Sequence, residues 1–468
     1  SLHDALPISG SWAVTSAKRK LRRPAEPTVS LLDLLDGLLS AAESLELEQA
    51  VLGRPPKAIR RRPAAALGQA IEAALPFPTE QVPWYPLGCF CPTTEQPGRF
   101  LAHAAGAYFV QDAGSMLALR LLDAQPGEWI ADLCAAPGAK SSAILETVGP
   151  GGGFLLANEP VRGRLPPLVY NLARVGFPRY VVTATDPDRL DAGWAEQFAA
   201  VLVDAPCTGQ SLVGRGRQSV AAFSPQQIAH SAARQRRILV AAARLVQPGG
   251  RLVYSTCTFA AAENEEVVAD FLGQHSGWRE EPLAALEPWR SPLTPGGYRL
   301  YPHRDRCAGA YAVRLRRPGE PATDAGRLCR GEQAGAEPLV IGGEEVGQLR
   351  ACRLLRQHGR WEDWPVELTG RALAGGYASE VAYQPGKHWM PAHALALRRD
   401  DGWQPGQSLE LTDEQAQQFL QGLALSAGPQ GWTVATWRGH PLGWLRGNRD
   451  RANNGLPAAA RLGFVAVG

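Results

Sequence analysis

Between residues 101 and 318, short apolar segments that end in polar residues alternate with amphipathic segments, and this alternation limits the possible folds more than any other feature. The apolar segments lie in EWIADLCAAPGAKSSAILETV, GGFLLANEP, AAVLVDAPCTG and GGRLVYSTCTF. Strand-length runs separated by segments of helical periodicity predict repeated β-α units. Such units assemble into a parallel sheet with helices on both faces. The sequence therefore predicts an α/β fold with a mostly parallel sheet.

The whole chain has 468 residues, 45% of them apolar and 20% charged, which is ordinary globular composition but too long for one core. We expect residues 1–26 to be disordered or non-native, because they show no periodicity. Leucines at helical spacing from Ser30 and a second helix over Pro63 to Leu75 predict a small N-terminal α/β domain at 27–100, which ends in an aromatic- and proline-rich passage of turns and short strands. The α/β unit occupies 101–318, a linker 319–337, and a β-rich region of one or two modules 338–468, with one helix capped by Thr412.

Net charge is only +3, so any surface for nucleic acid must be a local patch. The basic runs Lys18 to Arg23 and Lys57 to Arg62 are candidates, although a solvated charged face explains each equally well. The sequence shows neither an apolar run of membrane-spanning length nor a signal-peptide pattern. The eight cysteines form no CxxC pair. We therefore expect free thiols in a reducing cytoplasm, no membrane association and no bound metal.

The segment Asp132 to Ser141, DLCAAPGAKS, follows a predicted strand and opens a predicted helix. Its small residues and Gly138 allow a ligand to approach the backbone, and the helix N-terminus offers free N–H groups. The spacing is neither GxGxxG nor a Walker A loop. A nucleoside that carries a carboxylate, such as S-adenosylmethionine, suits it, and an ordinary strand-to-helix turn is an equal alternative.

Acidic residues follow the next strands, where ligands bind in open parallel sheets. Glu159 is placed to accept hydrogen bonds from two ribose hydroxyls, although a surface glutamate is the simpler explanation of that residue alone. Asp186 could accept a hydrogen bond from an adenine amino group, with Asp188 as the alternative, while a turn-forming aspartate is the plain interpretation of both. Asp132 and Asp204 end two further strands.

Two cysteines occupy polar positions at predicted strand ends: Cys207 in VDAPCTG and Cys257 in YSTCTF. Both should face the same crevice as the acidic residues. A single cysteine within an apolar segment is more often a small core residue. We predict that simpler role for Cys134, Cys307, Cys329 and Cys352.

Four motifs, DLCAAPGAKSS, ANEPVRGR, VDAPCTG and YSTCTFAAAENEEVV, resemble in order and spacing those of the Nop/Sun family of RNA cytosine-5 methyltransferases. The resemblance covers about residues 80–318, and the C-terminal extension resembles a PUA-type RNA-binding region. It implies a Rossmann-like domain that uses S-adenosylmethionine, an RNA-binding N-terminal domain, and a protein that acts as a monomer. Its expected partner is 16S ribosomal RNA or the small ribosomal subunit, with transfer RNA as an alternative.

The resemblance also implies a role for each motif residue. Cys257 is the expected nucleophile, and Cys207 is expected to assist product release. Asp204 should stabilise the activated base by a hydrogen bond to its ring nitrogen or amino group. The expected cofactor contacts are Cys134, Ala135, Ala136, Pro137, Gly138, Ala139, Lys140, Glu159, Asp186 and Asp204.

Three departures from the family pattern concern substrate detail rather than reacting groups. Ala139 stands where a second glycine is usual, and Thr208 to Ser211 replaces Ser-Gly-Glu-Gly. CAGAYAVRL, after Pro302 and His303, replaces a segment with Asp-Gly-Phe-Phe. Two other classes remain open: a DNA cytosine-5 methyltransferase, in which Cys207 would be the nucleophile, and a non-catalytic RNA-binding ribosome assembly factor.

Overall fold

The structure is a computed structural model, and it describes residues 35, 37–63, 75–320, 335–350, 353–357, 359–365, 368, 376–426, 428–448, 450–463 and 465–466. Five predictions fall wholly or mostly outside these residues. They concern residues 1–26, the basic run Lys18 to Arg23, the helix over Pro63 to Leu75, the linker, and the core positions of Cys329 and Cys352.

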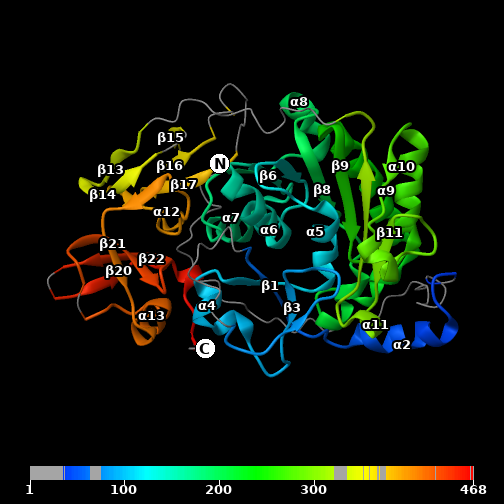
Figure 1. The fold of residues 1–468 in the computed structure, drawn as a ribbon, viewed down its shortest axis with the longest axis horizontal. Helices are drawn as coiled ribbons and strands as arrows, with labels where there is room; N and C mark the ends of the chain where they lie inside the picture. The colour runs from blue at the N-terminus through cyan, green and yellow to red at the C-terminus, as the bar shows by residue number, and fades with distance from the viewer. Residues whose placement is uncertain are drawn as a thin grey trace.

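A mixed sheet forms the centre of the catalytic region (Figure 1). Its strands are β5 (Trp129–Asp132), β6 (Phe154–Asn158), β7 (Tyr180–Thr183), β8 (Phe198–Asp204), β9 (Val246–Thr256), β10 (Arg279–Glu280), β11 (Gly297–Leu300) and β12 (Ala310–Arg316). The order is β10-β12-β9-β8-β5-β6-β7, with β11 paired to β12. Strands β5 to β9 pair in parallel and the other three antiparallel, so the predicted mostly parallel sheet is confirmed.

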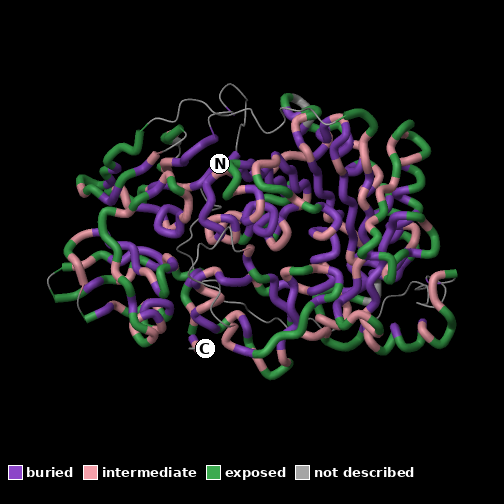
Figure 2. The backbone as a smooth tube through the Cα atoms, viewed as in Figure 1, coloured by how far each residue is buried: buried purple, intermediate pink, exposed green. Residues whose placement is uncertain are grey.

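Helices cover both faces of this sheet, as predicted (Figure 2 shows the central strands buried). One face packs against α5 (Leu117–Leu122), α6 (Ala139–Val148) and α7 (Leu165–Ala173). The other packs against α8 (Asp191–Trp194), α9 (Pro225–Leu245) and α10 (Glu265–Gln274). Leu155 faces the first layer and Leu156 the second, and both are fully buried. Each such side chain contributes roughly 1.5–3 kcal/mol of burial free energy, so the sheet provides a rigid base for its loops.

Before this sheet lies a small antiparallel one, in the order β2-β3-β1-β4. It comprises β1 (Ala58–Arg61), β2 (Glu80–Gln81), β3 (Gly88–Phe90) and β4 (Tyr108–Val110). The short helix α4 (Leu101–Ala104) lies before β4 in the chain. The short strands predicted in the aromatic-rich passage are confirmed. The first described helix, α2 (Ala41–Leu52), starts later than the leucine pattern from Ser30 indicates. Ser40 and Glu43 form a capping box that fixes its start, and a turn with Gly37 at φ +75° precedes it.

The basic run Lys57 to Arg62 was predicted to be either an RNA-binding patch or a solvated charged face. Both predictions are wrong for two of its arginines, because these are buried. Arg60 is 1% exposed and Arg62 is 4% exposed. Arg60 pairs with Glu146 of α6 and donates to Ser142 Oγ at 3.0 Å. Neither arginine belongs to a solvated face or an RNA patch. The strand alternation that turns them inward joins the N-terminal sheet to the catalytic region.

The C-terminal region is β-rich, as predicted, and contains three small sheets. They are formed by β13 (Glu337–Ile341), β14 (Glu344–Leu349) and β19 (Trp403–Pro405); by β15 (Leu354–Gln357), β16 (Arg360–Asp363), β17 (Ser379–Tyr383) and β18 (Met390–Pro391); and by β20 (Ser408–Glu410), β21 (Gly431–Trp437), β22 (His440–Gly447) and β23 (Ala452–Asn454). The short helices α11 (Pro302–Asp305) and α12 (His393–Ala396) lie outside the main layers. Thr412 caps α13 (Asp413–Leu420), which confirms that prediction.

Two backbone pairings attach this region to the rest of the chain. Tyr377 and Val182 of β7 exchange hydrogen bonds of 2.8 and 2.9 Å at the edge of the central sheet. Ala466 N donates to Arg99 O at 2.8 Å, beside α4. Among the helices of the described residues, none is long and apolar enough to cross a membrane.

Candidate functional site

The predicted site residues lie at the carboxyl ends of adjacent parallel strands. Asp132 ends β5, Asp204 ends β8, and Cys257 directly follows β9. Glu159 directly follows β6, and Asp186 lies three residues beyond β7. Because parallel strands end at one edge of the sheet, a single surface carries all five residues.

The loop Cys134–Lys140 leads from β5 into α6. Gly138 has φ +106°, and a Cβ there would lie 3.1 Å from Asn171 Cβ, so a side chain would be both strained and crowded. Arg164 Nη2 donates to Ala136 O at 2.7 Å, and Asn171 Nδ2 donates to Pro137 O at 2.8 Å. The loop is therefore held from α7 and the turn before it, with its glycine packed closely against α7.

Glu159 is 2% exposed and its two carboxylate oxygens have different surroundings. Oε1 accepts from Val161 N at 3.0 Å, whereas Oε2 lies 3.0 Å from Arg164 Nη1 but accepts no hydrogen bond from any described residue. A buried carboxylate oxygen without a donor is costly unless a ligand supplies one. Two ribose hydroxyls would satisfy it, so Glu159 and the Gly138 loop fit S-adenosylmethionine.

Asp186 lies in an ion pair with α9, and its expected contact with adenine stays a prediction. Both of its carboxylate oxygens lie 3.2 Å from Arg237 Nη1 of α9, and Oδ1 accepts from Asp188 N at 3.1 Å. Asp188 shares the same arginine at 2.6 Å. Among the described residues, no hydrogen bond joins Asp186 to the Cys134–Lys140 loop.

Asp132 and Asp204 have opposite degrees of exposure. Asp132 is 1% exposed and accepts from Ser141 Oγ at 2.6 Å; its burial raises its pKa to about 7, against the lowering effect of that hydrogen bond. Asp204 is half-buried, pairs with Lys140 Nζ at 2.7 Å and accepts from Ser255 Oγ at 2.7 Å. Burial opposes the charge of Lys140, but Asp204 outweighs it and raises the pKa of Lys140. The ammonium therefore stays charged beside the sulfur atoms.

The two cysteines meet, with their Sγ atoms 3.3 Å apart, and Cys257 N lies 3.4 Å from Cys207 Sγ. The hydrogen bond from Cys207, supported by Lys140, lowers the pKa of Cys257. The same hydrogen bond, together with burial, raises the pKa of Cys207 well above its usual value. The pair is thus asymmetric: the pKa of Cys257 is lowered and that of Cys207 is raised, so a thiolate forms more readily at Cys257 than at Cys207.

A pocket of about 180 Å³ opens beside Cys257. Lys140, Asp204 and Ser255 line its inner end, and Asp112 and Arg215, which pair at 2.5 Å, line another wall. The pocket therefore offers a nucleophilic sulfur, a carboxylate and a cation to one small planar group.

The six cysteines among the described residues all carry free thiols. The predicted core position of Cys307 is confirmed, because it is 1% exposed. Cys134 is only half-buried, at the edge of the hydrophobic cluster on the α9 face of the sheet.

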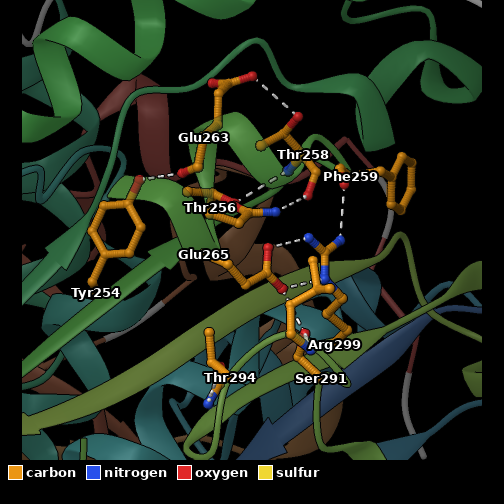
Figure 3. Close-up of polar contacts among 12 residues, drawn as sticks. Tyr254, Thr256, Thr258, Phe259, Glu263, Glu265, Ser291, Thr294 and Arg299 are labelled. Carbon is orange, nitrogen blue, oxygen red and sulfur yellow. Dashed lines mark hydrogen bonds and ion pairs between the residues drawn. The ribbon is translucent and has the colours of Figure 1, made fainter. Parts of the chain in front are cut away.

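Sequence reasoning gave no role to Asn158, Arg164 or Glu263, which support the site. Asn158 is fully buried, and its Oδ1 accepts from Thr183 Oγ1 at 2.8 Å, which ties the ends of β6 and β7 together. Glu263 accepts hydrogen bonds from Thr208 and Thr258, which directly follow the two cysteines. Neighbouring Glu265 pairs with Arg299 at 2.5 Å (Figure 3). All three lie within the motifs ANEPVRGR and AENEEVV, and their place in these motifs is the sequence feature that could have indicated their role.

Taken with the fold, the glycine loop after β5, the buried carboxylate of Glu159 and the pair of thiols at the carboxyl edge of the sheet fit a methyltransferase that uses S-adenosylmethionine. Comparison with known proteins indicates the kind of methyltransferase. Residues 119–316 match the model described as 16S rRNA methyltransferase RsmB/F, and residues 407–462 match the methyltransferase RsmF PUA domain. The protein is accordingly an S-adenosylmethionine-dependent RNA methyltransferase, similar to the RsmB/F model over residues 119–316 and to the RsmF PUA domain over residues 407–462.

Similar proteins agree with this assignment. Ribosomal RNA small subunit methyltransferase F of Klebsiella pneumoniae is 29% identical over 399 residues, covering 77% of this chain and 79% of that protein. Its counterpart from Escherichia coli K12 is 28% identical, with the same coverage. The crystal structure of a methyltransferase homologue from Pyrococcus horikoshii matches with TM-score 0.50 and 25% identity, over 62% of this chain and 100% of that one. NSun6 from the same organism, with TM-score 0.51 and 18% identity over 62% of this chain and 98% of that one, supports the fold.

Proposed function

We propose that the protein transfers a methyl group from S-adenosylmethionine to carbon 5 of a cytosine in 16S ribosomal RNA, through a covalent bond between Cys257 and the base. The observation that supports this chemistry most directly is the Cys207–Cys257 pair, 3.3 Å between sulfur atoms, with the pKa of Cys257 lowered. Carbon 5 of cytosine is a weak nucleophile, and addition of a thiolate at carbon 6 makes it electron-rich. The bound cofactor supplies an electrophilic methyl group on its sulfonium sulfur.

The residues of the chain divide the remaining work. Cys257 Sγ forms the bond to carbon 6, while Asp204 accepts from the amino group or protonated ring nitrogen of the base and stabilises the adduct. Lys140 holds Asp204 in an ion pair of 2.7 Å and favours the Cys257 thiolate. After methyl transfer, Cys207 removes the proton from carbon 5, the bond between Cys257 Sγ and carbon 6 breaks, and the methylated base leaves.

The thiol form of Cys207 is compatible with that later role as a base. Its raised pKa depends first on the hydrogen bond to Cys257 and also on the charge of that sulfur. Addition to the base consumes the Cys257 thiolate, so this influence disappears in the adduct. Cys207 then loses its proton to solvent water more readily, and the thiolate so formed can accept the proton from carbon 5.

The choice of ribosomal RNA rests on the relatives, which are named ribosomal RNA small subunit methyltransferase F, and on the PUA match. The base must leave its stack to enter the pocket. The N-terminal sheet and the C-terminal region would bind the RNA around it. One chain supplies every residue named above, so we expect the monomer to be active.

A labelled-methyl assay tests this function on 16S ribosomal RNA, small ribosomal subunits, transfer RNA and duplex DNA, with bisulfite sequencing to locate the product. We expect methylcytosine in ribosomal RNA. Cys257→Ala should abolish methylation but retain cofactor binding, and Cys207→Ala should accumulate a covalent enzyme–RNA complex. Methylation of DNA that requires Cys207 and not Cys257, or an absence of both turnover and cofactor binding, would contradict the proposal.

A further inference from the structure

Glu263 is a completely buried carboxylate whose hydrogen-bond partners all donate to it. It ends the 3-10 helix Ala261–Glu263, between β9 and α10, and is 0% exposed. Its oxygens accept from Thr208 N at 3.0 Å, Thr208 Oγ1 at 2.5 Å, Thr258 Oγ1 at 3.2 Å and Gln235 Nε2 at 2.8 Å. Four donors on one carboxylate are an unusually complete set for a residue that touches neither cofactor nor pocket.

The identity of the donors connects Glu263 to the chemistry. Thr208 directly follows Cys207, and Thr258 directly follows Cys257. The two threonine Oγ1 atoms are themselves 3.0 Å apart. Gln235 also donates to the carbonyl of Pro206, the residue before Cys207, at 3.2 Å. One carboxylate thus joins the turns that follow β8 and β9, beside the direct hydrogen bonds from Ser211 N to Cys257 O at 3.2 Å and from Phe259 N to Gln210 Oε1 at 2.9 Å.

The main chain of Glu263 is fixed independently of its carboxylate. Tyr254 Oη donates to Glu263 O at 2.5 Å (Figure 3). Asn264 Nδ2 donates to Thr258 O at 3.1 Å and its Oδ1 accepts from Thr256 Oγ1 at 2.6 Å. A change confined to the Glu263 carboxylate should therefore leave the course of the backbone intact.

We propose that Glu263 is a positioning residue for both cysteines: its carboxylate joins the turn after Cys207 to the turn after Cys257 and so holds both sulfur atoms where they act on the same base. This inference rests on the proposed cytosine chemistry. An acceptor-only group is required, because every partner donates. Glutamine in its place would direct an NH2 group at those donors and leave at least one buried donor unsatisfied.

The charge of Glu263 adds an electrostatic effect to this geometry. It contributes to the raised pKa of Cys207, after the hydrogen bond to Cys257, burial and the charge of Cys257. Burial raises the pKa of Glu263 itself, while its donors lower it. Glu263 thereby helps to keep Cys207 as a thiol until Cys257 has reacted.

The first test compares Glu263→Gln with Glu265→Gln. Glu265 lies two residues away, is also buried, and pairs with Arg299 and Ser291 instead of the cysteine turns. Transcribed 16S ribosomal RNA and labelled S-adenosylmethionine give the turnover rate, and denaturing gels give the fraction of enzyme bound covalently to RNA. We expect Glu263→Gln to lower turnover at least about tenfold and to raise the covalent fraction, because a displaced Cys207 releases product slowly. Glu265→Gln should lower the melting temperature and leave the covalent fraction unchanged.

If the fraction of Glu263→Gln bound covalently to RNA equalled that of the wild-type enzyme, the inference would be overturned. If the wild-type enzyme itself gave neither product nor adduct, the proposed function would fail, so the two failures are distinguishable.

A second test needs no RNA. In a Cys257→Ala background, the rate of Cys207 alkylation by iodoacetamide is measured against pH, with and without Glu263→Gln. Removing the nearby negative charge should shift the profile to lower pH. An unchanged profile in protein that melts cooperatively would contradict the inference. If Glu263→Gln does not fold, Thr258→Val removes a single donor and should raise the covalent fraction by a smaller amount, and an unchanged fraction there would equally overturn the inference.

Discussion

Arg60 of β1 and Glu146 of α6 form a buried ion pair that joins the N-terminal sheet to the catalytic region. Glu146 also lies 3.6 Å from Arg62 Nε. Burial lowers the pKa of Arg62 to about 10, against the opposing effect of Glu146, and two of its guanidinium nitrogens have no hydrogen-bond partner among the described residues. One carboxylate therefore balances two buried guanidinium groups.

Glu146→Ala should destabilise the protein by about 3–5 kcal/mol, because it leaves buried cations without a counter-charge. Urea unfolding at neutral pH measures this loss. Glu80→Ala provides the matched control, since Glu80 pairs with Arg306 at 2.7 Å on the surface, where such pairs contribute about 0–1 kcal/mol. Equal losses in the two variants would show that the buried pair has no special importance.

Lys140 and Asp204 should change the reactivity of Cys257 in opposite directions, because Lys140 lowers its pKa and Asp204 raises it. Lys140→Met should shift the alkylation of Cys257 to higher pH, and Asp204→Asn should shift it to lower pH. Mass spectrometry of the peptide that contains Cys257 follows the reaction. Shifts of the same sign would refute this electrostatic account.

Asp132 should make stability depend on pH. Its pKa rises from 3.8 to about 7 on folding, so between these values the folded protein binds more protons than the unfolded chain, and the free energy of unfolding falls as pH rises. Asp132→Asn removes this contribution. The variant, compared with wild type by urea unfolding, should therefore be less destabilised at pH 7 than at pH 4.5. A difference independent of pH would show that Asp132 titrates normally.

Glu159→Gln should weaken binding of S-adenosylmethionine about tenfold, or roughly 1.4 kcal/mol, since the neutral amide is a poorer acceptor for ribose hydroxyls. Isothermal titration calorimetry measures the dissociation constant. Gly138→Ala should weaken binding as well, because of its φ of +106° and the contact with Asn171. Unchanged affinity in both variants would place the cofactor elsewhere.

Asp186→Asn tests the adenine contact implied by the resemblance. We expect weaker cofactor binding by a similar factor. Since Asp186 also pairs with Arg237, Arg237→Met serves as the control for loss of that ion pair alone. If both variants bind the cofactor like wild type, Asp186 serves the ion pair with Arg237 and not the cofactor site.

The sequence predicted the features that depend on local order. Apolar runs that end at Asp132, Asp204 and Cys257 identify the reactive edge of the sheet, because a strand end is visible in the residues themselves. Thr412 likewise identifies the start of α13. The Ser40–Glu43 capping box carries the same kind of signal for the start of α2, whereas residues 30–34 of the leucine pattern lie outside the described residues.

Features that depend on distant partners could not be predicted. An arginine is usually exposed, so the sequence alone suggests a surface position for Arg60. Only the pairing of β1 places it against Glu146, 86 residues away. Glu263 receives its donors from Thr208 and Gln235, which are 55 and 28 residues away. The ion pair between Asp186 and Arg237 likewise depends on how α9 packs. Such contacts follow from tertiary packing, which a single sequence does not specify.

The pairing of Tyr377 with Val182 affects which nucleotide of a bound RNA reaches the thiol pair. Because the chain after the linker is fastened to the outer strand of the catalytic sheet, and again near α4, the spacing between PUA domain and thiol pair is built into the framework. Lengthening the linker should therefore leave the methylated nucleotide unchanged. Disrupting the Tyr377 pairing should allow neighbouring nucleotides to be methylated as well.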